Sequence, residues 1–362
     1  MNTSEIIEKM EQGRTPSPAE LAYLLDLDDG PELRQLFAAA YRTKLRYVGN
    51  TVHLRGLIEF SNICSKNCYY CGIRRGNDKV KRYLIPEDEI VEQALAADRM
   101  GLGSVALQSG ERSDPEFVDM VERILRKIKM ESGGRLGITL SSGEQTEETY
   151  RRWFSAGAHR YLLRIETSDP ELYAKLHPAD HSWENRRNCL KILSKIGYQT
   201  GTGVMVGLPF QTVGHVARDI LFFQENDMDM IGMGPYIVHD DTPLAKEVSG
   251  FDPEKQLLLG LKTIAVTRLL LKDINIASTT ALQALRPDGR KQGLLAGANV
   301  IMPNVTESSR RDGYLLYRGK PGIYDDSLRG LEILKREVAE AGEKILWNDW
   351  GDSPHFFKRC VK

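Results

Sequence analysis

The feature that most constrains the fold is a repeated succession of short apolar segments and longer amphipathic segments. Most of the short segments are followed by apolar residues at helical spacing. Nearly continuous apolar strands that alternate with helices are typical of a parallel sheet covered by helices. Eight segments read as strands, at residues 53–60, 104–110, 136–142, 160–167, 199–207, 230–238, 274–278 and 298–304. Such units over roughly 250 residues predict an α/β fold with a complete (β/α)8 barrel of the TIM type; an open doubly wound sheet is the alternative.

The regions outside this succession read as extensions of a single domain. Residues 1–50 are polar and helical in pattern, with Ser17 and Pro18 placed to start a helix. No Pro- or Ser-rich linker and no low-complexity tract divides the chain. We therefore expect an N-terminal helical extension over residues 1–50, the barrel over 51–320 and a C-terminal helical extension over 321–362.

Composition excludes several classes of protein. The formal net charge is −1, so no basic surface for nucleic acid or membranes is expected. The first residues are polar and acidic rather than basic and then apolar, and the longest apolar runs are too short to cross a bilayer. Five cysteines do not make a disulfide framework in 362 residues. We expect a cytoplasmic protein with reduced thiols.

Polar residues gather where several predicted strands end. They follow the strands at residues 108–111, 141–144 and 166–167, and three cysteines follow the first strand. Each cluster alone is compatible with an ordinary loop. Because active sites of parallel barrels lie at the carboxyl ends of the strands, the clusters together predict a site at that end.

The cysteine loop has three closely spaced thiols, Cys64, Cys68 and Cys71, with the spacing C-x3-C-x2-C. A structural zinc site takes four ligands, and the other two cysteines are poorly placed: Cys189 lies in a predicted helix and Cys360 lies near the C-terminus. Thiolates also bind iron–sulfur clusters, in which four irons need four ligands. Three thiolates would leave one iron open to a small molecule. A zinc site with another donor and a chance grouping remain the alternatives.

This loop, with an aromatic residue directly before the third cysteine, resembles the radical S-adenosylmethionine (SAM) enzymes. The resemblance implies a 4Fe–4S cluster, held by the three cysteines, whose open iron chelates SAM and reduces it to a 5′-deoxyadenosyl radical. Further stretches resemble the HydE family, the radical SAM maturases that act in assembly of the di-iron site of FeFe-hydrogenases; biotin synthase and methylornithine synthase are related. These stretches are IEFSNICSKNCYYCGIRR, LQSGE, YLLRIET, ENRRNCL, VGLPFQT, GMGPYI, DTPLA and GANVIMPN.

The resemblance also implies site residues. Ser109, Gly110 and Glu111 match the segment that meets the SAM amino group, while Glu166 and Arg186 match positions around its ribose and carboxylate. All residues expected at SAM are Tyr70, Ser109, Gly110, Glu111, Thr139, Arg164, Glu166 and Arg186. Those expected to line the substrate cavity are Arg55, Gln108, Arg160, Met230, Thr279 and Thr280. For Met230, core packing is the alternative, and for Arg186 it is a solvated helix position.

The chain departs from the family pattern at three places. Residues 305–359 contain no cysteine, so only one cluster is expected. The stretch from His239 to Asp241 and the residue Arg310 differ from the family, both near the predicted barrel mouth. These differences affect the expected substrate more than the expected cofactors.

The sequence thus predicts a radical SAM maturase with a small-molecule or organometallic substrate. The expected partners are an electron donor of the flavodoxin or ferredoxin type and other hydrogenase maturases. One alternative is a mutase or hydrogen-abstracting enzyme that acts on a small amino acid, as methylornithine synthase does. Another is a non-catalytic carrier of an iron–sulfur cluster.

Overall fold

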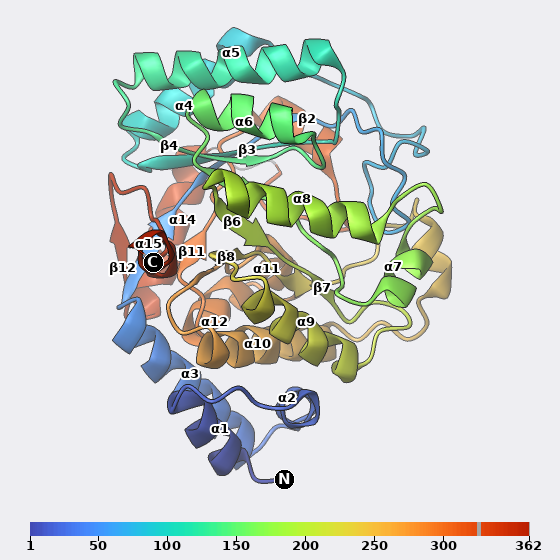
Figure 1. Ribbon diagram of the computed structural model, residues 1–362, viewed down its shortest axis with the longest axis vertical. Coiled ribbons are helices and arrows are strands. Elements are labelled where there is room, and N and C mark those ends of the chain that lie inside the picture. Colours follow the sequence, from blue (N-terminus) through green and yellow to red (C-terminus); the bar gives the residue numbers. More distant parts are fainter. Residues whose placement is uncertain (324–326, 362) are drawn as a thin grey trace.

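A curled parallel sheet of seven strands forms the centre of the protein (Figure 1), whose computed structural model describes residues 1–323 and 327–361. The strand order is β10-β8-β6-β5-β4-β3-β2, and each neighbouring pair is parallel. The strands are β2 (Gly56–Ser61), β3 (Ser104–Ser109), β4 (Gly137–Ser141), β5 (Arg160–Leu162), β6 (Gln199–Thr202), β8 (Met230–Ile231) and β10 (Asn275–Ile276). The predicted parallel α/β fold is confirmed.

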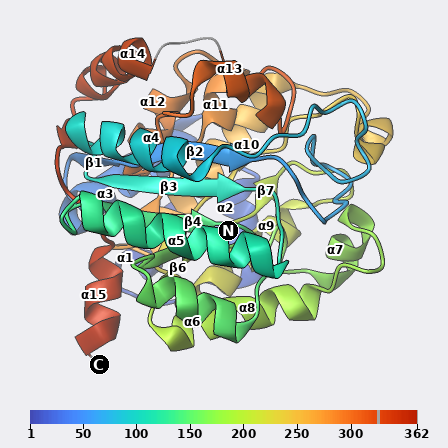
Figure 2. The same cartoon turned by 90° about the horizontal axis from the view of Figure 1, so that it is seen from above.

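Helices that follow the strands cover the outer face of this sheet (Figures 1 and 2). Three of them begin with an Asp cap and a Pro in the first turn, as at Asp114 and Pro115, where the Asp114 carboxylate accepts from Phe117 N. The longer helices are α4 (Glu87–Arg99), α5 (Pro115–Glu131), α6 (Glu147–Ser155), α8 (Trp183–Ile196), α9 (Val213–Glu225) and α10 (Pro253–Leu270). The shorter ones are α7 (Pro170–Leu176), α11 (Thr280–Leu285), α12 (Gly289–Leu295) and the 3-10 turn η1 (Pro243–Glu247).

Two strands near the edges of the seven-stranded sheet belong to a second sheet. Strand β1 (Thr51–Leu54) pairs in parallel with β11 (Val300–Ile301). Single bridges also join Val300 to Ala277 and Asn304 to Leu57. The predicted last strand, 298–304, therefore hydrogen-bonds with the chain on both sides, next to β10 and next to β2. The predicted strands 199–207 and 230–238 are each interrupted, and a separate parallel pair, β7 (Met205–Val206) and β9 (Gly234–Pro235), continues them.

Three helices precede the strands: α1 (Thr3–Glu11), α2 (Pro18–Leu25) and α3 (Pro31–Tyr47). Ser17 and Glu20 form a capping box at the start of α2, so the predicted start at Ser17 and Pro18 is confirmed. Helix α2 packs on α9, and α3 packs on α10. The N-terminal helices thus lie against the helical layer rather than at the strand ends (Figure 1).

The last part of the C-terminal region, from residue 344 on, runs across the amino ends of the strands, whereas residues 313–316 lie at their carboxyl ends against the cysteine loop. Strand β12 (Lys344–Leu346), which the sequence did not predict, pairs in parallel with β1. The other elements are α13 (Ser308–Arg311), η2 (Asp312–Tyr314), α14 (Ser327–Glu340) and α15 (Pro354–Val361). Figure 1 shows β12 and α15 at the opposite end of the sheet from α7, and Figure 2 shows the same for α15. Of the predicted extension 321–362, residues 324–326 and 362 lie outside the described residues.

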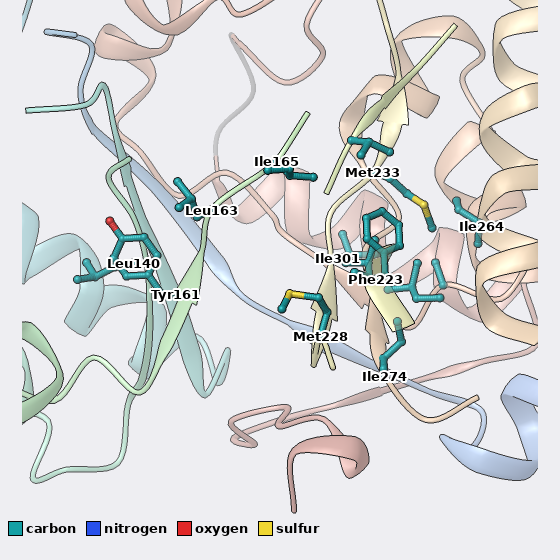
Figure 3. Packing of buried hydrophobic residues seen from close by; sticks show 14 of the residues in the cluster. Leu140, Tyr161, Leu163, Ile165, Phe223, Met228, Met233, Ile264, Ile274 and Ile301 are labelled. Carbon is teal, nitrogen blue, oxygen red and sulfur yellow. The ribbon is translucent and has the colours of Figure 1, made fainter. Parts of the chain in front are cut away.

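One large apolar core joins the strands to the helices around them. Phe223 of α9 and Ile264 of α10 pack with residues of the strand region, among them Ile301 of β11. Figure 3 shows this packing for Leu140, Tyr161, Leu163, Ile165, Phe223, Met228, Met233, Ile264, Ile274 and Ile301. Among the described helices, none combines the length and the apolar character that a membrane span requires.

Candidate active site

The cysteine loop leaves the carboxyl end of β2 and is tied to three other segments. Ser65 N donates to Glu111 O across 2.8 Å, Tyr69 N to Leu176 O across 2.9 Å, and Gly72 N to Leu316 O across 3.1 Å. These bonds join the loop to the ends of β3 and α7 and to the chain after η2. The sequence placed the loop at this end of the sheet, and the structure confirms that placement.

The three cysteines of this loop are half-buried. Burial raises the pKa of Cys68 to about 12, and it raises the pKa of Cys64 and of Cys71 too. The charge of Cys64 also raises the pKa of Cys68, and the charges of Cys64 and Cys68 raise the pKa of Cys71. The three thiols therefore lie close together. The Glu111 amide donates to Cys64 Sγ across 3.3 Å. Such a donor favours the thiolate that a metal requires.

Within the described residues, no three His, Cys, Asp or Glu side chains converge as the ligands of one metal ion do. A 4Fe–4S cluster does not need that arrangement, because each cysteine thiolate binds a different iron of the cluster. The three thiols are therefore compatible with a cluster.

Two histidines that the sequence analysis missed hold the loop from outside. Asn67 N donates to His181 Nε2 across 3.0 Å, and the Tyr70 hydroxyl lies 3.2 Å from His177 Nε2. Both histidines come from the segment between α7 and α8. No local motif indicates them, because the contact depends on a loop more than a hundred residues earlier in the chain.

A network of charges joins the loop to the ends of β3 and β4. Arg186 Nη1 donates to Glu144 Oε1 across 2.9 Å and lies 3.5 Å from Glu111 Oε2. Lys66 Nζ lies 3.3 Å from Glu111 and 3.2 Å from Glu144. Burial raises the pKa of Glu111, whereas Arg186 and Lys66 contribute to a lowered pKa at Glu144. The predicted pair Glu111 and Arg186 is thus brought together, and Glu144, not named among the expected site residues, joins it.

The strand-end segment at Ser109 and Gly110 lies directly against the cysteine loop. A Cβ at Gly110 would stand 2.3 Å from Ile63 O, so only glycine permits this close approach. Ser109 Oγ donates to Ser142 Oγ across 3.0 Å, which links the ends of β3 and β4. The backbone of this segment is held next to Cys64.

Arg164 and Glu166 follow β5 and form an ion pair with 3.0 Å between Nη2 and Oε2. Glu166 has a φ of +68°, in the left-handed region that a residue with a side chain rarely adopts. Arg164 Nε and Thr279 Oγ1 are buried without a hydrogen-bond partner among the described residues, and the contact between Arg164 and Glu166 is an ion pair without hydrogen-bond geometry. Buried polar atoms are normally satisfied, so these atoms point to a bound polar molecule.

The remaining expected cavity residues near this end also have partners. Thr280 Oγ1 lies 2.8 Å from the Tyr317 hydroxyl, and the Gln108 side chain lies near Tyr314. Both tyrosines come from the chain after α13 and were not predicted. Gln108 is paired in register with Glu59, whose buried carboxylate forms an ion pair with Lys320.

Four expected residues lie elsewhere, away from the cysteine loop. Arg160 is the first residue of β5 and is completely buried. Its guanidinium donates to Thr139 Oγ1 across 2.9 Å and to Trp350 O across 2.7 Å, and it pairs with Asp352. Because these partners occupy it at the amino ends of the strands, the structure separates Arg160 and Thr139 from the cysteine loop.

Arg55 and Met230 lie at the same end. Arg55 Nη1 lies 3.0 Å from Met230 Sδ, and Arg55 Nη2 donates to Gly351 O across 3.0 Å. Met230 is the first residue of β8 and is buried. The expected site residues thus divide into two groups, one at each end of the sheet. Arg55, Thr139, Arg160 and Met230 lie at the amino end, and the others lie at the carboxyl end.

Among the residues that depart from the family pattern, the partly buried His239 ring lies against Gly72 of the cysteine loop, whereas Asp240, Asp241 and Arg310 have surface partners. Asp241 pairs with Lys79, and Asp240 accepts from Arg318 Nε across 2.9 Å. Arg310 lies 3.7 Å from Glu89 of α4. These side chains have partners on the surface rather than at the buried polar atoms near Glu166.

Comparisons with known proteins give the chain a family. The family model of the Radical SAM superfamily matches residues 58–223. The chain is 44% identical over 359 residues to the FeFe-hydrogenase maturase subunit HydE of Thermotoga maritima, covering 99% of each protein. It is 29% identical over 313 residues to 3-methylornithine synthase of Methanosarcina acetivorans, covering 86% of this chain and 85% of that protein.

A solved structure agrees with these relatives. The crystal structure of methylornithine synthase matches 95% of this chain and 98% of its own with a TM-score of 0.80 at 26% identity. The site and these similarities together show that the chain is a radical SAM enzyme and belongs to the HydE family.

Proposed function

We propose that this enzyme acts in maturation of the di-iron site of FeFe-hydrogenase, using reductive cleavage of SAM at a 4Fe–4S cluster. The single observation that carries the proposal is the position of the three-thiol loop directly beside Arg186 and Glu111. A small molecule bound to an open iron at this loop would meet a guanidinium and a carboxylate at once.

The residues present fit one cluster. Cys64, Cys68 and Cys71 provide three thiolates, and the loop contains no fourth cysteine. Cys189 is buried on α8 with its thiol toward Gln145 O, and Cys360 is exposed on α15. Both are on other elements, so we propose one cluster with one iron left for SAM. When bound, the cluster and SAM supply one-electron chemistry that no protein side chain here provides.

The residues also fit SAM, whose aminoacyl group has one positive and one negative end. The Glu111 carboxylate suits the ammonium, and the Arg186 guanidinium suits the carboxylate. Glu166 Oε2 forms an ion pair with Arg164 but accepts no hydrogen bond from the described residues, so it can accept from the ribose hydroxyls. Tyr70, Ser109 and Gly110 offer backbone groups next to the cysteine loop. We propose that these residues bind SAM, together with Arg164 at the ion pair with Glu166.

For the substrate, Arg164 Nε, which is buried without a hydrogen-bond partner among the described residues, suits an anion. Thr279, Thr280 and Gln108 add hydroxyl and amide groups on the same side of the sheet. We propose a small anionic or organometallic substrate at this position. The amino end of the sheet holds the other expected residues, which are Arg55, Arg160, Thr139 and Met230. We therefore assign substrate contact to Arg164, Thr279, Thr280 and Gln108.

Two features of the fold support a closed barrel around this site. Asn299 N donates to Ile276 O across 2.9 Å, and Leu57 N donates to Pro303 O across 2.8 Å. A strand hydrogen-bonded at both edges of the sheet is what closure by an eighth strand requires. We propose a complete (β/α)8 barrel over residues 51–320, with 1–50 and 321–362 as extensions that pack on it.

We further propose a cytoplasmic enzyme that receives electrons from a flavodoxin- or ferredoxin-type donor and works with other hydrogenase maturases. A methylornithine synthase activity is less well supported, because identity to that enzyme is 29%, against 44% to HydE. A non-catalytic carrier would not need the charge network beside the thiols.

The test combines the reconstituted protein with SAM, a reductant, the other maturases and an FeFe-hydrogenase that lacks its di-iron site. The expected result is hydrogen evolution that depends on this protein and is lost in Cys68→Ser. Formation of 5′-deoxyadenosine without any activation of the hydrogenase would keep the radical SAM activity and overturn the maturation role.

A further inference from the structure

Asp219 is a buried carboxylate that the proposed SAM site does not use directly. It lies on α9 with no exposed side-chain surface. Its Oδ1 accepts from Ser168 N and from Ser168 Oγ, both across 2.6 Å, and from Thr167 Oγ1 across 3.4 Å. Burial of a carboxylate is costly, and because Asp219 Oδ2 has no hydrogen-bond partner among the described residues, the bonds to Oδ1 alone compensate for it. All of these bonds go to the two residues that follow Glu166.

The turn that Asp219 holds is strained. Glu166 has a φ of +68°, although it has a side chain, and such a conformation persists only where the surroundings enforce it. Ahead of the turn, Glu166 N donates to Gly203 O across 3.0 Å. Behind it, Asp219 fixes Ser168 and Thr167. The strained residue is thus held on both sides, and Asp219 provides the fixed point on the carboxyl side.

The same turn is linked to the proposed SAM carboxylate site. Trp183 Nε1 donates to Thr167 O across 3.1 Å, and Arg186 Nε donates to Arg164 O across 2.9 Å. Both donors lie in α8. A movement of residues 164–168 would therefore displace the Glu166 carboxylate and also disturb the helix that carries Arg186.

We propose that Asp219 is a positioning residue that holds the Glu166 turn in the conformation that presents its carboxylate to the ribose hydroxyls of SAM. The inference rests on the proposed SAM site. It assigns no contact between Asp219 and SAM. Burial raises the pKa of Asp219 to about 6, so at neutral pH its bonds to Ser168 are largely charge-assisted, which strengthens them.

The test measures the dissociation constant of SAM and of S-adenosylhomocysteine by anaerobic equilibrium dialysis with the reconstituted protein. Asp219→Leu keeps the branching of the side chain at Cγ and removes the acceptor; we expect both dissociation constants to rise at least tenfold, with the iron content per chain unchanged. Asp219→Asn keeps one acceptor oxygen, so its rise should be smaller. In turnover assays, KM for SAM should rise while kcat at saturating SAM stays within about twofold.

A matched control separates positioning from loss of stability. Asp229 is an equally buried aspartate, at the other end of the sheet, that accepts from Thr200 N across 2.8 Å and pairs with Arg359. Asp229→Asn should lower the melting temperature and leave SAM affinity unchanged. If Asp219→Leu does not fold, Ser168→Ala, which removes one donor to Asp219, should raise the dissociation constant about threefold.

An analogue identifies the route of the effect. The 2′,3′-dideoxy form of S-adenosylhomocysteine lacks the hydroxyls that Glu166 would accept from, so Asp219→Leu should weaken its binding by a smaller factor, limited to the effect through Arg186. An equal loss of affinity for both probes would overturn the inference. So would wild-type SAM affinity in a folded, iron-loaded variant, whether Asp219→Leu or Ser168→Ala. Absence of SAM binding to the wild-type protein would instead overturn the proposed function.

Discussion

Arg186 and Glu144 form a buried ion pair, 2.9 Å between Nη1 and Oε1, that joins helix α8 to the end of β4. Glu144 also accepts from Lys66 of the cysteine loop across 3.2 Å and from Asn185 across 2.6 Å. A single carboxylate thus orients a guanidinium and an ammonium that come from distant parts of the chain. Its position beside the thiols makes it part of the proposed SAM site.

We expect Glu144→Gln to weaken SAM binding about tenfold, equivalent to ~1.4 kcal/mol, because Arg186 and Lys66 lose the charge that orients them. Iron content should not change, since Glu144 is not a proposed ligand. Glu147→Gln, an exposed position on α6, is the control and should behave as wild type. If Glu144→Gln bound SAM as tightly as the wild-type protein or more tightly, the role of Glu144 would be contradicted.

Cys68→Ser should abolish cluster binding and leave the fold intact, because the thiol belongs to a loop outside the main apolar core. Cys189→Ser should keep the cluster, since Cys189 lies on α8 and contacts Gln145 O. Iron analysis and visible absorbance after anaerobic reconstitution check both. Wild-type iron content in Cys68→Ser would show that the ligand assignment is wrong; loss of iron in Cys189→Ser would indicate a fourth thiolate.

Stability should fall as the pH is lowered through the range 6.5 to 4. Burial and the nearby Arg160 lower the pKa of His159 to about 4. The unfolded chain therefore binds a proton near pH 6.5, whereas the folded chain binds it only near pH 4. This difference lowers the free energy of unfolding by about 2–3 kcal/mol over this window. Denaturant titrations of wild type and His159→Gln check this. A variant with the same pH slope as wild type would exclude His159 as the cause.

The buried pair of Lys44 and Glu343 joins α3 to the residue before β12, with both side chains fully inaccessible. Lys44→Met leaves the Glu343 carboxylate buried without its partner, so we expect a loss of about 3–5 kcal/mol in the free energy of unfolding. The double variant Lys44→Met, Glu343→Leu should recover most of that loss, because both charges are removed. A double variant no more stable than Lys44→Met would contradict this account.

The sequence predicts the parallel fold and the cysteine loop because both depend on local patterns. Apolar periodicity identifies β3, at 104–110 by sequence and Ser104–Ser109 in the structure. Strand β5 ends at Leu162 rather than at residue 167; the chain beyond it stays beside the neighbouring strand through a single bridge from Glu166 to Val204, and the left-handed φ of Glu166 ends the extended conformation. Strand β12 was missed because its three residues have no clear pattern and its pairing depends on β1.

The distribution of site residues was harder to predict. Side chains two residues apart on a strand share a face, so Arg164 and Glu166 were expected together, and they form an ion pair. The alternation does not tell which end of a strand a long side chain reaches. Arg160 was expected in the cavity, yet Asp352 and Trp350 hold it at the amino end. Those partners follow it by about 190 residues, so no local pattern relates them.

The most direct test of the central claim is electron paramagnetic resonance of the reconstituted, dithionite-reduced protein, recorded with and without SAM. An iron left open by three thiolates predicts that SAM changes the spectrum of the cluster, and that Arg186→Leu, in which the cluster still forms, shows little change at the same SAM concentration. A wild-type spectrum that SAM leaves unchanged, in a sample with a full complement of cluster, would contradict the account.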